Sequence, residues 1–219
     1  MSSEPPGGVH SVEADEAKPE LSGATLVQAR GAALLDALER HLPGSRDHAN
    51  GTASYAFAAA AQLGTGRARA EMLRETARLH EIGKVYLPRD LLTEPREELD
   101  PRERGLVDSH PAYGAELARG AGVPDAACDW IGAVGERFDG AGTGGLAGER
   151  IPLEARIMRA ACNCDRLLAT RSGPGTPATY REAINPLRAA AADGELDSRV
   201  VNALAGIVER AARGSGYSA

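Results

Sequence analysis

The stretch that decides the fold is "LHEIGKVYLP", residues 79–88, in which a histidine and a glutamate stand side by side ahead of a glycine and a lysine. The residues before it place Leu73 and His80 at helical spacing, which predicts a helix that turns His80 inward at its end. Gly83 suits the left-handed residue that follows a helix. A histidine and a carboxylate at a buried helix end form half of a metal site when a second histidine reaches them from another helix.

The composition favours packed helices. The chain has 219 residues, of which 42% are hydrophobic and only 4% aromatic. Alanine, leucine and arginine are abundant, whereas the β-branched and aromatic runs that build sheets are scarce. We therefore expect an all-α protein with one core of ordinary size.

The charge of the chain limits its partners. Against 25 basic residues stand 31 acidic ones, a formal net charge of −6, and no Lys/Arg block occurs. We expect no DNA, RNA or membrane partner, although a local pocket can still bind a small anion. No apolar run reaches the roughly 20 residues that span a bilayer, and the three cysteines are too few for a disulfide framework. These features predict a cytoplasmic protein.

The chain divides into a tail and one helical domain. Residues 1–23 are rich in Pro, Gly, Ser and Glu and are predicted to be disordered. Residues 24–214 form the domain, in which the Gly-rich stretch 136–152 must be a loop. Asp100 begins a helix through a capping box, and His110 before Pro111 marks a kink or a break. Helices are expected from residue 25 to about 41, from about 46 to 64 and over 67–81. Another is expected from Asp100 into the stretch 109–120, one after residues 122–125, and three more at about 153–170, 178–192 and 196–213.

Several blocks, in order, resemble the HD-GYP branch of the HD phosphohydrolase superfamily. They are "LLDALERHLPGSRDH", "LHEIGKVYLPRDLL", "LDPRERGLVDSHPAYGAELA", "ERFDGAGTGGLAGERIPLEARIM" and "LDSRVVNALAGIV". The likeness covers residues 34–212 and implies a single all-helical domain with a Gly-rich signature loop. It also implies a metal-dependent phosphodiesterase that acts on cyclic di-GMP in bacterial signalling.

The resemblance assigns roles to individual positions. The family's first metal-binding histidine corresponds to His48, its HD pair to His80 and Glu81, and the histidine of its third segment to His110. Its substrate-contacting, catalytic lysine corresponds to Lys84, and its late metal aspartate falls on Cys162. Each of these histidines, taken alone, is more often a surface or satisfied core residue than a ligand.

The chain departs from the family pattern in several ligands. The paired histidines before the loop fall on Val134 and Gly135, which have no ligand atoms, and Gly-Tyr-Pro falls on residues 142–144 as Gly-Thr-Gly. At most one divalent transition metal (Fe, Mn or Zn) is then expected, with no metal as the alternative. Loss of a second ion would cost several kcal/mol of transition-state stabilisation, about a thousandfold in rate.

Three interpretations of function follow. The preferred one is a degenerate HD-GYP-like domain with a regulatory or ligand-binding role in cyclic-dinucleotide signalling and weak or no hydrolysis. The first alternative is a phosphohydrolase with a reduced, single-metal site. The second is a scaffold that only contacts proteins.

A cyclic dinucleotide or another phosphate ligand would contact Lys84 and Arg171, with Arg137 and Asp139 of the loop beside it. The loop is either a contact for a protein partner or a flexible connector.

Overall fold

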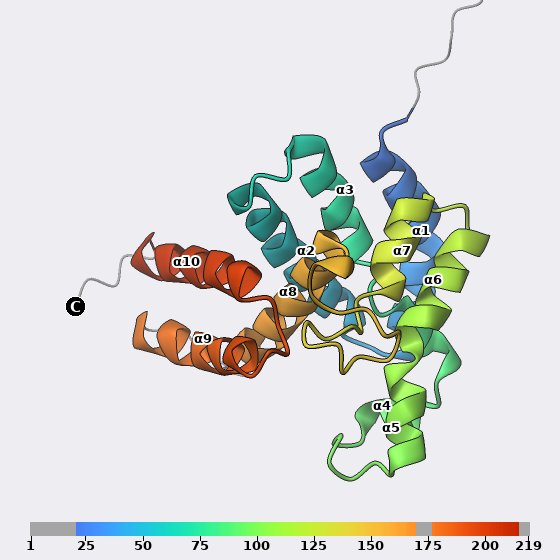
Figure 1. The fold of residues 1–219 in the computed structure, drawn as a ribbon. Coiled ribbons are helices and arrows are strands. Elements are labelled where there is room, and N and C mark those ends of the chain that lie inside the picture. The colour runs from blue at the N-terminus through green and yellow to red at the C-terminus, as the bar shows by residue number, and fades with distance from the viewer. Residues whose placement is uncertain (1–20, 170–176, 215–219) are drawn as a thin grey trace, which may run out of the picture.

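Helix α8 (Leu153–Ala169) runs through the centre of the structure and packs against α2 (Ser45–Gln62) (Figure 1). Ala160 and Ala161 of α8 belong to one buried cluster with Ala56 and Ala60 of α2. Small side chains on both helices let the two backbones approach closely. Polar residues on these helices can therefore bond to one another directly across the interface.

The computed structural model describes residues 21–169 and 177–214, and this part of the chain is helical with no strand. The prediction of an all-α fold is confirmed. Beside α2 and α8 the helices are α1 (Gly23–His41), α3 (Arg67–Ala77), the 3-10 turn η1 (Ile82–Tyr86), α4 (Arg89–Thr93), α5 (Pro101–Asp108), α6 (His110–Gly120), α7 (Asp125–Gly132), the 3-10 turn η2 (Gly148–Arg150), α9 (Pro177–Ala192) and α10 (Ser198–Gly214).

Two large apolar clusters hold the helices together. One joins α2, α3 and α8 to the hairpin of α9 and α10, which lie side by side (Figure 1). The other joins α1, α6 and α7 and includes Leu38, Ile82 and Ile131, each almost fully buried. Leu79 and Ile82, on either side of His80 and Glu81, both belong to this second cluster, and η1 packs against α1 and α6, so tertiary packing fixes the position of the segment.

Local signals predicted most helix ends. Asp100 accepts hydrogen bonds from the backbone N–H groups of Arg102 and Glu103, and the Glu103 carboxylate closes the capping box. The break at His110 separates α5 from α6. Ser22 caps α1, and residues 1–20 of the predicted tail lie outside the described residues. The Gly-rich stretch is a loop apart from the short turn η2.

The prediction around Gly83 was wrong in two respects. Helix α3 ends at Ala77, so His80 follows in a turn, and Gly83 has no positive φ. A Cβ atom at Gly83 would lie 1.9 Å from the backbone oxygen of His110. The glycine is required for close contact between η1 and α6, not for a left-handed helix end. The chain between η1 and α5 also contains the short helix α4.

No helix among the described residues has the length and apolar character needed to cross a membrane.

Candidate metal centre

His48 is held by two groups on α8. Its Nδ1 lies 2.7 Å from an Asp165 carboxylate oxygen, and its Nε2 lies 3.4 Å from Cys162 Sγ. A carboxylate that accepts from one ring nitrogen leaves the other free as a ligand, an arrangement found behind many metal-bound histidines. Asp165 reaches His48 over Gly51, where a Cβ atom would lie only 1.9 Å from the carboxylate oxygen. The glycine of α2 therefore makes this contact available.

His80 has a ring nitrogen, Nε2, that lies near His48 and makes no hydrogen bond to the described residues. Its Nδ1 lies 2.8 Å from the Ala77 carbonyl oxygen, to which it donates. The buried Nε2 has no hydrogen-bond partner in the described part of the chain, and it lies 3.9 Å from a Glu81 carboxylate oxygen. An unpartnered buried nitrogen is costly unless something binds it.

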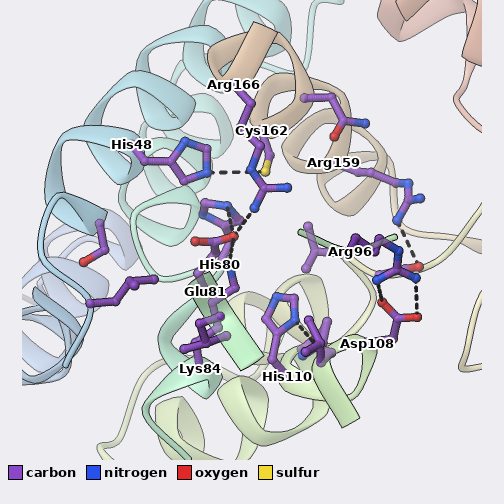
Figure 2. A pocket seen from close by; sticks show the side chains of 18 of the residues that line it. His48, His80, Glu81, Lys84, Arg96, Asp108, His110, Arg159, Cys162 and Arg166 are labelled. Carbon is purple, nitrogen blue, oxygen red and sulfur yellow. Dashed lines mark hydrogen bonds and ion pairs between the residues drawn. The ribbon is translucent and has the colours of Figure 1, made fainter. Parts of the chain in front are cut away.

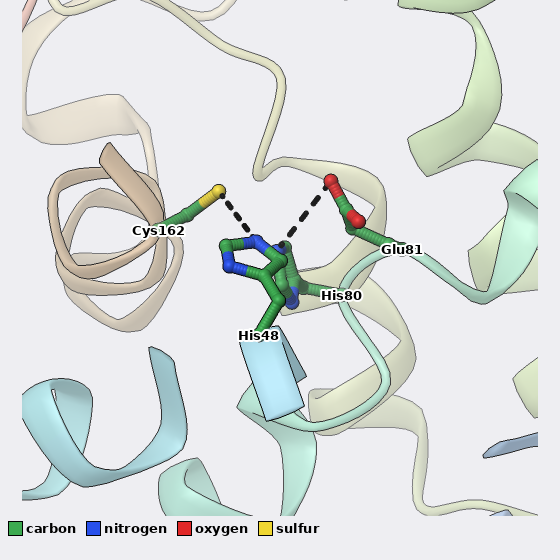
Figure 3. A group of neighbouring side chains, drawn as sticks. All are labelled: His48, His80, Glu81 and Cys162. Carbon is green, nitrogen blue, oxygen red and sulfur yellow. Dashed lines mark hydrogen bonds and ion pairs between the residues drawn. The ribbon is translucent and has the colours of Figure 1, made fainter. Parts of the chain in front are cut away.

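Four side chains converge, as Figure 3 shows. One ligand atom from each of His48, His80, Glu81 and Cys162 lies within 4.8 Å of the others. Two imidazoles, a carboxylate and a thiolate are ligands of zinc and related transition metals. The donor types and the orphaned His80 nitrogen both fit a bound divalent ion.

The electrostatics favour the ligand form of Cys162 and the protonated form of His48. Burial opposes a thiolate at Cys162, but the neighbouring imidazoles of His80 and His48 lower its pKa to about 6. Thiolate is the form of cysteine that binds metals. Burial also opposes a positive charge on His48, but its hydrogen bonds to Asp165 and Cys162 raise its pKa to about 9. Metal binding at His48 therefore releases a proton.

Glu81 is a buried carboxylate with two basic partners. Lys84 Nζ lies 2.5 Å from Oε1, and Arg166 forms an ion pair with the same oxygen. Burial opposes the charge of Glu81, but these cations, Lys84 foremost, hold its pKa well below the usual value.

His110 lines the cavity but lies outside the set of four. Its Nδ1 lies 2.8 Å from the Val107 carbonyl oxygen, to which it donates, so Nε2 carries the lone pair. Burial, together with the positive charge of Lys84, lowers its pKa to about 4. His110 is neutral at pH 7. Val134 and Gly135 lie in the same wall without any ligand atom.

The candidate ligands open on a cavity of about 1060 Å³ with basic walls (Figure 2). Arg137 lines it, and Asp139 stands behind Arg137 at 2.7 Å. The predicted Arg171 lies outside the described residues. The basic residues in the lining are Lys84, Arg96, Arg137, Arg159 and Arg166.

Sequence reasoning missed Asp165 and Arg166. Both follow Cys162 on α8 by one helical turn, at i+3 and i+4. Residues at these spacings share a helix face, so a ligand at Cys162 could have pointed to both. Arg96 and Arg159 carried no local signal.

Comparisons with known proteins place this site in a family context. The family model for the HD domain matches residues 32–200. The cyclic di-GMP phosphodiesterase response regulator RpfG of Xanthomonas campestris is 36% identical over 118 residues, which are 51% of this chain and 30% of RpfG. The 3'3'-cGAMP-specific phosphodiesterase 2 of Vibrio cholerae is 30% identical over a match that covers 68% of this chain and 29% of the phosphodiesterase. The chain spans about a third of the length of the curated relatives it matches.

Solved structures share the fold. An HDG"Y"P protein of Bdellovibrio bacteriovorus, Bd1817, superposes with a TM-score of 0.63 at 22% identity, over 85% of this chain and 61% of the other. The HD domain of the Listeria monocytogenes phosphodiesterase PgpH, in complex with cyclic-di-AMP, superposes with a TM-score of 0.63 at 17% identity. The match covers 85% of this chain and 98% of the PgpH chain.

Proposed function

The chain belongs to the HD domain family, and we propose that it binds one divalent transition metal and a cyclic dinucleotide, with weak hydrolysis and a regulatory or ligand-binding role. The observation that carries the proposal is the convergence of four ligand side chains, His48, His80, Glu81 and Cys162. The relatives named above support a cyclic dinucleotide as the ligand class.

The metal is one that binds thiolate ligands well. Cys162 replaces an oxygen ligand by sulfur, and sulfur favours zinc or iron over manganese or magnesium. A bound ion would polarise a phosphoryl oxygen and lower the pKa of a water molecule. The residues of the chain that would hold it are the same four, with Asp165 orienting the His48 ring.

The other residues of the cavity bind and position the ligand. Lys84 and Arg166 place positive charge beside Glu81, where a phosphate group can approach. Neutral His110 can accept a hydrogen bond from a water molecule or a ribose hydroxyl through Nε2. The cavity of about 1060 Å³ lies at the upper end of the volumes that hold small ligands, as a dinucleotide requires.

Weak hydrolysis follows from the wall that carries Val134 and Gly135. A second ion would find no donor at either position, so one of the two clamps of a two-metal displacement is missing. Loss of about 4 kcal/mol of transition-state stabilisation corresponds to about a thousandfold in rate. A binding role therefore suits the site better than efficient turnover.

A single-metal phosphodiesterase is the second candidate. It rests on the low pKa of Cys162 and on the His80 nitrogen that lacks a partner in the described part of the chain, which suit the bound ion that both candidates require. Turnover of a cyclic dinucleotide separates the two candidates, since both predict metal and ligand binding.

The test uses a pair of cysteine variants. The full chain is purified without chelators, its metal content is measured, and Co²⁺ is titrated while the thiolate-to-cobalt absorption is recorded. We expect one equivalent of metal and a thiolate band that disappears in Cys162→Ser. The band should persist in Cys164→Ser, because Cys164 is buried in the apolar cluster.

Binding and hydrolysis are measured on the same samples with cyclic di-GMP, 3'3'-cGAMP and cyclic-di-AMP. Binding of one of them with turnover at least a hundredfold below that of a two-metal relative supports the binding role. Turnover equal to that relative favours the enzyme. A chain that takes up less than a tenth of an equivalent of metal and binds no dinucleotide would refute both.

A further inference from the structure

Arg166 reaches the candidate ligands from α8. It follows Cys162 by four residues, so the two side chains share one face of the helix, and Figure 2 shows both pointing into the cavity. Its Nη2 donates to Oε1 of Glu81, one of the four candidate ligands. The Arg166 side chain is 51% exposed, whereas that of Glu81 is 6% exposed. Arg166 therefore joins a buried carboxylate to the open part of the cavity.

Most donors of Arg166 remain available. Its Nε and Nη1 have no protein partner within residues 21–169 and 177–214. A guanidinium carries five N–H donors in one plane, and two of them match the oxygens of a phosphate group. Arg166 donates to Glu81 through Nη2, so its Nε and Nη1 can still donate two hydrogen bonds to an anion.

The remaining arginines of the cavity are engaged elsewhere. Arg96 binds Asp108 through both Nη atoms, each at 2.7 Å. Arg159 binds Glu195 at 2.8 Å and the Gly135 carbonyl oxygen at 3.1 Å. Among the lysine and arginine side chains of the described ranges, only Lys84 and Arg166 form an ion pair with a candidate metal ligand.

We propose that Arg166 supplies positive charge in place of a second metal ion: its guanidinium, together with Lys84, neutralises Glu81, and it binds a phosphate oxygen of the ligand. This role rests on the proposed function and extends it. Val134 and Gly135 have no ligand atoms, so they cannot bind a second metal ion. The guanidinium supplies positive charge in place of that ion.

Two opposite effects follow from this arrangement. A metal ion held by Glu81 would have to share the carboxylate with the guanidinium, so Arg166 would weaken metal binding by repulsion and by competition for Oε1. A phosphate gains a charge-assisted contact from the same group. Removal of the charge should therefore tighten metal binding and weaken phosphate binding. A side chain that only stabilised the fold would move both affinities in the same direction.

The experiment compares Arg166→Gln, Arg166→Lys and Arg119→Gln in the full chain. Arg119 is a matched control, because its side chain is 50% exposed and pairs with carboxylates of α7, away from the cavity. Zn²⁺ affinity is measured by competition with a chromophoric chelator, and inorganic phosphate binding by calorimetry on the zinc-loaded and metal-free protein.

We expect Arg166→Gln to bind Zn²⁺ about tenfold more tightly and phosphate about tenfold more weakly, a change of about 1.4 kcal/mol in each direction. Arg166→Lys should keep most of both affinities, and Arg119→Gln should change neither. Unchanged or weaker Zn²⁺ binding in Arg166→Gln would overturn the role of Arg166, even if wild type binds one equivalent. If wild type binds no metal, the proposed function fails, and the phosphate titration of the metal-free protein decides the role of Arg166 by itself.

Discussion

Replacement of Gly51 by alanine should weaken metal binding, although Gly51 is not one of the four candidate ligands. A Cβ atom at this position would lie 1.9 Å from Oδ1 and 2.6 Å from Cγ of Asp165, well inside van der Waals contact. The carboxylate oxygen, at 1.9 Å, must move by about 1.6 Å to restore a contact distance near 3.5 Å, which breaks the 2.7 Å bond of Asp165 to His48. The His48 ring then loses its orientation.

The magnitude follows from two opposing terms. A hydrogen bond between charged, mostly buried groups is worth about 1.5–3 kcal/mol, and the His48 and Asp165 side chains are only 17% and 15% exposed. Alanine in a helix interior is about 0.5–1 kcal/mol better than glycine. We therefore expect Gly51→Ala to lower the free energy of unfolding by about 1–2 kcal/mol. Loss of the group behind a metal-bound histidine should weaken metal binding by about 10- to 100-fold.

Urea unfolding and Zn²⁺ competition measure both quantities. Gly105→Ala in α5 is the control, because no atom lies within 4 Å of a Cβ there, and it should be neutral or slightly stabilising. Asp165→Asn should reproduce the loss, and the double variant should be no worse than either single one. Additive losses, or a Gly51→Ala protein with wild-type Zn²⁺ affinity, would refute the reasoning.

Two further predictions concern the contact between η1 and α6. The pKa of His110 falls from 6.5 to about 4 on folding, so the unfolded chain binds more protons between these values and stability rises with pH across that window. His110→Gln should remove up to about 3 kcal/mol of the stability lost between pH 7 and pH 4, and an unaltered slope in chemical denaturation would contradict this. Gly83→Ala would place a Cβ atom 1.9 Å from the His110 backbone oxygen, a contact that no rotamer change relieves. We expect a loss of about 3 kcal/mol or more in thermal unfolding, whereas Gly120→Ala, with open space around its Cβ, should leave stability nearly unchanged.

The helices themselves were readable from the sequence because their signals are local. Asp100 and Glu103 form the expected capping box, and the last three helices lie close to their predicted ranges. The region around His80 was read less well. The pattern there continues the period of α3, but packing against α6 replaces the end of the helix by a turn and η1. A close backbone contact between segments some 27 residues apart leaves no trace in a window of ten residues.

The sequence by itself determined the helical character of the chain, because composition and spacing carry that information. The predicted metal ligands, His48, His80, Glu81, His110 and Cys162, came from its resemblance to the HD-GYP family. Only the tertiary structure decided that His48, His80, Glu81 and Cys162 lie within 4.8 Å of one another. It also decided that Asp165 stands behind His48 and that Arg166 shares Glu81 with Lys84. The contact between Asp165 and His48 depends on how closely α2 and α8 pack, and that distance is set by small side chains on both helices together. The contact between Arg166 and Glu81 depends on where the turn before η1 lies relative to α8.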